Sequence, residues 1–294
     1  MRPVPGRELM EGPWFKGNLH LHSTRSDGGK DYRTVARLYA ERGYDFIFIT
    51  DHHIAADIES LHSLPLLALN GAEVSGRDRN GASYHVLALG CDAPLPETDS
   101  FDDLLLELKD RDALLALAHP HWMGNSVGDA LRHPFDGVEM YNHICRYLNG
   151  KGYSGFHWDR MLERDPLSLG LAVDDAHLNG NEPWDGGWVM VCASELTKTA
   201  VIEAIRAGRF YSSLGPTFDS IRVDESGIHL RTSPVVAVRL VDNTSWGARV
   251  YPGYGQTVTE AEFSLPAGRP FVRVEIEDER GRKAWTNALL VSET

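Results

Sequence analysis

The chain has 294 residues, of which 42% are hydrophobic and 24% are charged, and this is enough for one large globular domain with a small appendage. Acidic residues outnumber basic ones by 42 to 29, and the net charge of -13 argues against strong nucleic-acid binding, which requires a basic surface. Cys91, Cys145 and Cys192 are too scattered for a disulfide framework or a CxxC zinc site. No stretch approaches 18 apolar residues, so we expect a cytoplasmic protein with no membrane segment.

The first two thirds of the chain alternate short apolar segments with helix-like segments, which is typical of βαβ units. The expected strands are residues 17–23, 44–51, 66–75, 83–90, 114–120, 137–142 and 167–175. The expected helices are residues 31–43, 101–111, 157–165 and 197–208. Several of the strands are nearly continuous apolar runs, as expected of parallel strands that are covered on both faces. Seven such strands with helical connections favour a β/α barrel over a flat sheet.

From about Thr217 onwards, apolar and polar residues alternate with a period of two, and Gly, Asp and Asn interrupt the pattern. This pattern predicts β-hairpins. We therefore expect an α/β domain over residues 1–216 and a small antiparallel, sandwich-like β module over residues 217–294.

Histidine and acidic residues gather at the ends of the expected strands of the first domain. They are His20, His22, Asp27, His52, Glu73, His85, His119, Asp175 and His177. The period of a strand puts His20 and His22 on one face, and in a β/α barrel the carboxyl ends of the strands converge on one mouth. Each residue alone has an ordinary structural explanation, such as packing, a solvated strand end or a turn. Together they are hard to explain without metal, because so many buried polar groups would be left unsatisfied.

The order of these motifs resembles that of the PHP (polymerase and histidinol phosphatase) family of metallohydrolases. The matching segments are NLHLHSTRSDG (18–28), ITDHH (49–53), GAEVS (71–75), YHVLALG (84–90), AHPHW (118–122) and AVDDAH (172–177). The resemblance implies a distorted (β/α)7 barrel that holds up to three divalent metals. Residues 187–216 and 273–287 resemble a two-domain branch with a C-terminal β module, some members of which cleave carbamates or other non-phosphate bonds.

The resemblance also implies three ligand sets. The first is His20, His22, Glu73 and Asp175; the second is Glu73, His85 and His119; the third is Asp27, His52 and His177. Glu73 would bridge the first two metals. Spacing to His177 favours Asp175 over Asp174 as a ligand, and we expect Asp174 to be a structural hydrogen-bonding residue. Asp51 is expected to orient His52 or another ligand from behind.

We expect two or three divalent ions. Mixed histidine and carboxylate ligands suit Zn, Mn or Fe, and the sequence does not choose among these metals. We expect Glu73, His119, Asp175 and His177 to take part in catalysis, with a metal-bridging hydroxide as nucleophile. The leading hypothesis is a phosphoesterase that acts on a small phosphorylated molecule. The alternatives are a hydrolase of carboxylic or carbamic esters or amides, and a non-catalytic metal-bound scaffold. The oligomeric state is left open.

Substrate contacts are predicted less sharply than metal ligands. Arg25 and Arg146 are candidate anion contacts, and Trp122 is expected to pack at or rim the mouth. The other histidines considered as substrate contacts are His53, His121 and His143, followed by His62, His133 and His229.

Overall fold

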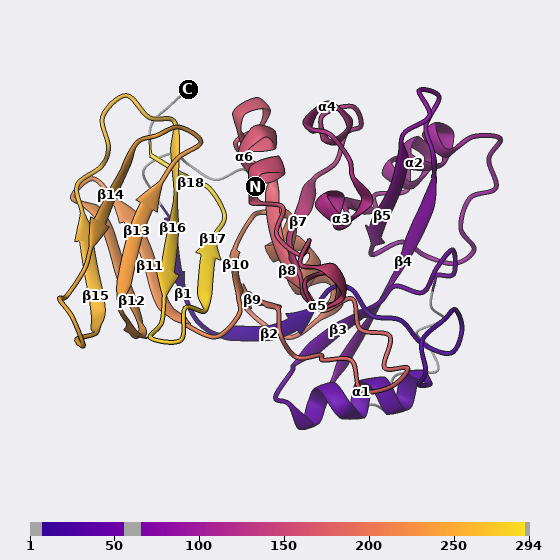
Figure 1. The fold of residues 1–294 in the computed structure, drawn as a ribbon, viewed down its shortest axis with the longest axis horizontal. Helices are drawn as coiled ribbons and strands as arrows, with labels where there is room; N and C mark the ends of the chain where they lie inside the picture. Colours follow the sequence, from indigo (N-terminus) through magenta and orange to yellow (C-terminus); the bar gives the residue numbers. More distant parts are fainter. Residues whose placement is uncertain (1–7, 56–65, 292–294) are drawn as a thin grey trace.

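The computed structural model describes residues 8–55 and 66–291. Within these residues, the strands form a 14-stranded mixed sheet and a four-stranded antiparallel sheet. Figure 1 shows the C-terminal strands, in orange and yellow, gathered on one side of the molecule and most of the helices on the other. The α/β class expected from the sequence is confirmed. Among the described helices, none has both the length and the hydropathy needed to cross a membrane.

The first half of the large sheet follows chain order in space. Its strands are β2 (Trp14–Asn18), β3 (Phe46–Ile49), β4 (Leu67–Arg77), β5 (Ser83–Leu89), β6 (Leu114–Leu117), β7 (Gly137–Asn142) and β8 (Leu169–Val173). The short apolar runs of β3, β6 and β8 are buried along their whole length, as expected of strands covered on both faces.

One strand runs against the expected direction. β5 pairs antiparallel with both β4 and β6, whereas the βαβ units expected in this part of the chain would make its strands parallel. The cause is a tight turn in which the Asp78 side chain accepts hydrogen bonds from the backbone N–H groups of Asn80 and Ala82, and Gly81 has a φ of 85°. The chain therefore returns directly as a hairpin with no crossover helix. The regular (β/α)7 pattern is interrupted at this point.

The sheet curls back on itself at the ends of β2 and β8. An isolated parallel bridge joins Leu21 to Ala176. The backbone N–H of His22 donates to the carbonyl of Ala176 (3.0 Å), and that of Asp175 donates to the carbonyl of His20 (3.0 Å). The first expected strand thus ends at Asn18, and the two histidines lie in the segment that closes this curl.

The helices connect these strands. They are α1 (Tyr32–Glu41), α2 (Phe101–Asp110), α3 (Pro120–Met123), α4 (Val127–Ala130), α5 (His143–Asn149), α6 (Gly155–Arg164) and α7 (Lys198–Arg206). Side chains of Asp31, Ser100 and Thr197 cap the starts of α1, α2 and α7, which agree with three of the predicted helices within about two residues. The sequence pattern does not predict α3, α4 or α5, because helices of four to seven residues are too short to show a period.

The remaining strands form the C-terminal side of the molecule. They are β9 (Trp188–Cys192), β10 (Phe210–Ser213), β13 (Ala237–Val241), β14 (Gly247–Val250), β16 (Phe271–Glu277), β17 (Lys283–Thr286) and β18 (Leu289–Leu290) in the large sheet, and β1 (Glu8–Glu11), β11 (Phe218–Asp224), β12 (Gly227–Val235) and β15 (Val258–Phe263) in the smaller one. β10 pairs with β17, and β1 pairs with β11. Both ladders connect the two expected domains across the boundary at residues 216 and 217, and the division into domains stays a prediction.

Candidate metal centre

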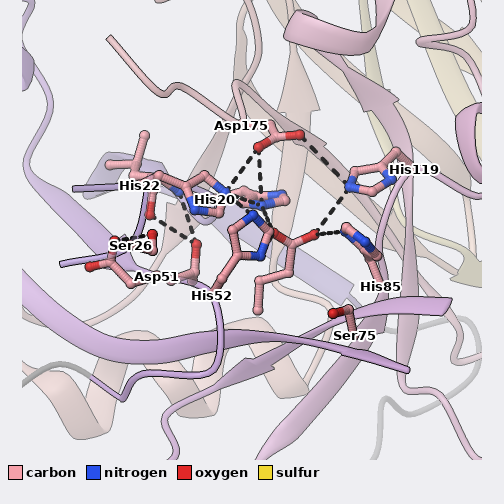
Figure 2. Close-up of polar contacts among 12 residues, drawn as sticks. His20, His22, Ser26, Asp51, His52, Ser75, His85, His119 and Asp175 are labelled. Carbon is pink, nitrogen blue, oxygen red and sulfur yellow. Dashed lines mark hydrogen bonds and ion pairs between the residues drawn. The ribbon is translucent and has the colours of Figure 1, made fainter. Parts of the chain in front are cut away.

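Glu73 lies at the centre of a histidine cluster. Figure 2 shows the five histidines that surround it, His20, His22, His52, His85 and His119, together with Asp175. This carboxylate is buried in the middle of β4, and its two oxygens face different histidines. Oε2 lies 3.2 Å from His20 Nε2, 3.3 Å from His22 Nε2 and 3.2 Å from His52 Nδ1, whereas Oε1 lies 2.7 Å from His85 Nδ1 and 3.2 Å from His119 Nε2. One carboxylate thus faces two groups of nitrogen donors, which is the geometry that a bridging ligand needs.

The first group of donors has the dimensions of a metal site. It comprises atoms of His20, His22, Glu73 and Asp175, all of them buried residues. The Nε2 atoms of the two histidines are 3.0 Å apart and lie 3.2 and 3.1 Å from Asp175 Oδ1. Tetrahedral zinc with metal–ligand distances of about 2.0–2.1 Å separates its ligands by about 3.3 Å. The donor set therefore fits a small divalent cation.

The donor group on the more exposed side of His22 corresponds to the third expected ligand set. Asp27, His52 and His177 contribute its other donor atoms. Asp27 Oδ2 is 3.5 Å from His52 Nε2 and 3.4 Å from His177 Nε2. His177 Nδ1 lies 3.0 Å from the backbone carbonyl of Asp175, which can only accept a hydrogen bond. Nδ1 therefore carries the proton, and the lone pair of the ring is on Nε2, which faces Asp27.

His85 and His119 reach Glu73 from the opposite side. His85 lies near the start of β5 rather than at a carboxyl end, and it reaches the mouth because this strand is reversed. His119 and Asp175 have left-handed backbones, with φ values of 30° and 57°. Such backbones are strained in residues other than glycine and often occur at functional sites.

Two residues behind the cluster, Glu139 and Asn142 of β7, are not predicted from the sequence. Glu139 is completely buried, and its Oε1 lies 2.6 Å from His20 Nδ1. Its Oε2 accepts hydrogen bonds from the backbone N–H of His119 and the side chain of Asn142, both at 2.9 Å. Asn142 also donates to Asp175 Oδ2 (3.1 Å). A single acidic residue within the apolar run GVEMYN is the signal that was available, because a buried carboxylate requires partners.

Two other acidic residues support the backbone near the site. Asp174 faces away from the cluster, as expected, and accepts hydrogen bonds from Asn18, Tyr39 and the backbone N–H groups of residues 185–187. Asp51 accepts hydrogen bonds from Ser23 and Ser26 and so fixes the loop that leads from His22 to Asp27. Asp51 thus acts on the loop that carries the candidate ligand Asp27, which is the second of the two roles expected for it.

The cluster has a strongly negative electrostatic character. Burial lowers the pKa of His20, but Asp175, Glu73 and Glu139 outweigh burial and raise this pKa well above its ordinary value. The pKa of His22 likewise rises to about 9, because hydrogen bonds to Asp175 and Glu73 outweigh burial. Burial alone would raise the pKa of Glu73, yet the histidines hold it well below its usual range. Glu73 is therefore ionised in the cluster, and its charge attracts cations.

A cavity of about 540 Å³ opens beside the cluster. Its walls are formed by Asp27, His52, Glu73, His85, His119, Trp122, Ile144, Cys145, Tyr147, Leu148, Asp175, His177, Asn181 and Glu182. Trp122 lines the mouth, as the sequence suggested. Burial and nearby carboxylates raise the pKa of the Cys145 thiol, so this side chain stays protonated and is no nucleophile. Arg25 and Arg146 are not among the lining residues.

The other candidate histidines have partners outside the cavity. His53 contacts Ser75, His121 contacts the carbonyl of Tyr153, and His143 contacts the hydroxyl of Tyr141. His133 lies near Asp78, and His229 near Glu262. His62 lies outside the described residues.

Comparison with curated proteins shows two partial similarities in sequence. The chain is 30% identical over 115 residues to the DNA polymerase/3'-5' exonuclease PolX of Bacillus subtilis. The matched segment covers 38% of this chain and 20% of that protein. The chain is also 30% identical over 105 residues to the phosphoribosyl 1,2-cyclic phosphate 1,2-diphosphodiesterase of Eggerthella lenta, covering 34% and 40% of the two chains. The matched segments thus span less than half the length of these relatives. No family model matches the chain.

Comparison with solved structures extends the similarity to nearly the whole chain. A two-domain protein from Bacteroides vulgatus, which contains a predicted PHP-like metal-dependent phosphoesterase, matches with a TM-score of 0.56 and 17% identity. The match covers 98% of both chains. This match shows a shared fold, and it agrees with the resemblance to the PHP family that the motifs indicate.

Proposed function

We propose that the protein is a metal-dependent phosphoesterase that holds two or three divalent ions. The observation that carries this proposal is the position of Glu73 between two groups of histidine nitrogens. Asp175 Oδ1 adds a second carboxylate oxygen, 3.2 and 3.1 Å from the Nε2 atoms of His20 and His22. Buried carboxylates that lie this close together are stabilised by bound cations.

In this proposal the nine candidate ligands divide among three ions. His20, His22, Glu73 and Asp175 would hold one ion. Glu73, His85 and His119 would hold a second, and Asp27, His52 and His177 a third. Nitrogen and carboxylate donors in this mixture suit Zn, Mn or Fe. The unpartnered and buried Nδ1 atom of His22 faces Asp27 at 3.6 Å, which supports a cation on that side as well.

The chemistry divides between the ions and the protein. Bound divalent ions supply Lewis acidity, which makes a water molecule nucleophilic near neutral pH and offsets the negative charge of a phosphate. Glu139 holds His20 with Nε2 turned into the site, and the carbonyl of Asp175 does the same for His177. His52, His85 and His177 are partly exposed in the cavity, so ions that they hold would lie within reach of a substrate there.

The comparisons support phosphoester chemistry over the alternatives. The Eggerthella lenta relative is named as a phosphodiesterase, and the Bacteroides vulgatus protein as PHP-like and metal-dependent. A complete set of donors also argues against a non-catalytic scaffold. One observation favours the ester or carbamate hydrolase as a second candidate: no Lys or Arg occurs among the described residues that line the cavity. Phosphate pockets usually contain such a cation.

The test is a substrate panel. Phosphomonoesters, phosphodiesters, aryl carboxylic esters and carbamates are assayed with protein reconstituted in Mn or Zn. The proposal expects phosphoester hydrolysis that a chelator abolishes and that added metal restores. Metal-dependent activity confined to aryl esters or carbamates would favour the second candidate, whereas no metal-dependent activity on any of the four classes would contradict both.

A further inference from the structure

One side of the cavity is an apolar wall formed by Trp122, Ile144, Tyr147 and Leu148. Tyr147 and Leu148 are 58% and 59% exposed, and Trp122 is 36% exposed. Large apolar side chains that remain exposed beside a concave site are typical of a binding surface, because their burial against a ligand is favourable.

The apolar wall is fixed to the metal cluster through α5. Ile144, Tyr147 and Leu148 are spaced three and four residues apart and so share one face of this helix. Asn142 accepts a hydrogen bond from the backbone N–H of Cys145 at the start of α5 and donates to Glu139 and Asp175 of the cluster. The wall therefore has a defined position relative to the candidate metal ligands.

Trp122 completes this surface from α3. Its ring packs edge-on against His119, with centroids 5.2 Å apart, and lies 6.4 Å from the ring of His85. A group held on the phosphate at the metal cluster would thus meet the indole without leaving the cavity. Trp and Tyr offer flat faces that favour aromatic partners beyond the area they bury.

The charge of the remaining lining residues restricts what this side of the cavity accepts. Asp27 and Glu182 line it beyond the central cluster, and no lysine or arginine occurs among its described lining residues. A second anionic group on the substrate would find no counter-charge here, so an uncharged ring fits better than a carboxylate or a second phosphate.

We propose that the apolar wall is a subsite for an aromatic group joined to the phosphate, and that the substrate is a phosphoester with such a group and no second anionic group. This inference rests on the proposed phosphoesterase function. It assigns the discrimination between substrates to Trp122, Tyr147 and Leu148 rather than to the metal ligands.

Calorimetric titration of the metal-loaded protein with three phosphonates tests the proposal. Benzylphosphonate, ethylphosphonate and 2-carboxyethylphosphonate share one head group and differ only in the attached group. Benzylphosphonate should bind at least about tenfold more tightly than ethylphosphonate, which is about 1.4 kcal/mol. The carboxyethyl compound should bind no more tightly than the ethyl compound. Equal affinity for the benzyl and ethyl compounds, or tightest binding of the carboxyethyl compound, would overturn the subsite alone.

Variants locate the preference on the wall. The double variant Tyr147→Ala/Leu148→Ala removes two exposed side chains, and its ratio of benzyl to ethyl affinity should fall toward one. Tyr254→Ala is the matched control, because Tyr254 is fully exposed and does not line the cavity. The control should keep the wild-type ratio. A double variant with an unchanged ratio would overturn the assignment. If none of the phosphonates binds to metal-loaded wild-type protein, both the subsite and the proposed function are wrong.

Discussion

Replacement of Glu139 by glutamine tests how the buried residues behind the cluster control metal binding. Glu139 Oε2 accepts two hydrogen bonds, from the backbone of His119 and from Asn142, so the single oxygen of the new amide should take this position. The amide nitrogen is then placed toward His20 Nδ1, which lies 2.6 Å from Oε1 in the wild type. Because an amide NH2 only donates, it favours the tautomer in which His20 carries its proton on Nε2.

That tautomer removes the lone pair that His20 turns toward His22, Glu73 and Asp175. Loss of a partner of this kind typically lowers metal affinity about 10- to 100-fold. Competition with a chelator measures the dissociation constant, and thermal unfolding checks that the variant is folded. Glu163→Gln, which changes an exposed carboxylate in α6, is the matched control and should keep wild-type affinity. Metal affinity within twofold of the wild type in Glu139→Gln would refute the reasoning.

Three further outcomes are expected. Glu73→Ala should reduce metal content and turnover more than His22→Ala, because the two oxygens of Glu73 face five histidine nitrogens from both sides of the cluster; near-normal turnover in the first variant and loss in the second would contradict this. Burial raises the pKa of Asp78, but hydrogen bonds from Arg132 and the backbone of Ala82 outweigh it and lower this pKa to about 2. The ionised Asp78 therefore stabilises the fold above about pH 4, and this contribution is lost as the pH falls through 2. Asp78→Asn should cost about 2 kcal/mol at pH 7, measured by urea unfolding, and much less near pH 2. Cys145→Ser should retain metal-dependent hydrolysis in the assay panel, since the thiol is protonated; complete loss of turnover in a folded, metal-loaded variant would contradict this.

The sequence predicted the membership of the cluster better than the path of the chain around it. All nine candidate ligands fall in the donor groups that the structure brings together, because strand ends and short spacings such as His20 to His22 leave little freedom in where these side chains lie. Their roles as ligands stay predictions, since geometry alone does not demonstrate binding.

The path around His85 required information that strand patterns do not contain. An apolar run such as residues 83–90 reads the same in a parallel and an antiparallel strand. The direction of β5 depends on the turn that Asp78 and Gly81 form, and only this reversal explains how a residue near the start of a strand reaches the mouth.

Residues behind the cluster were harder to predict than the cluster itself. Glu139 stands in a different motif from the histidines it supports, 119 residues from His20 in sequence. Tyr147 and Leu148 lie on a seven-residue helix, too short for its apolar face to stand out. Both features depend on tertiary contacts between β7, α5 and the closing segment after β2.

Metal content tests the central claim most directly. Protein purified without chelators, loaded with excess Mn or Zn and freed of unbound metal would be analysed for bound ions per chain. The donor groups around Glu73, Asp175 and Asp27 predict two or three equivalents, with a clear loss in Glu73→Ala. Less than one equivalent in the wild type at saturating metal would contradict the account.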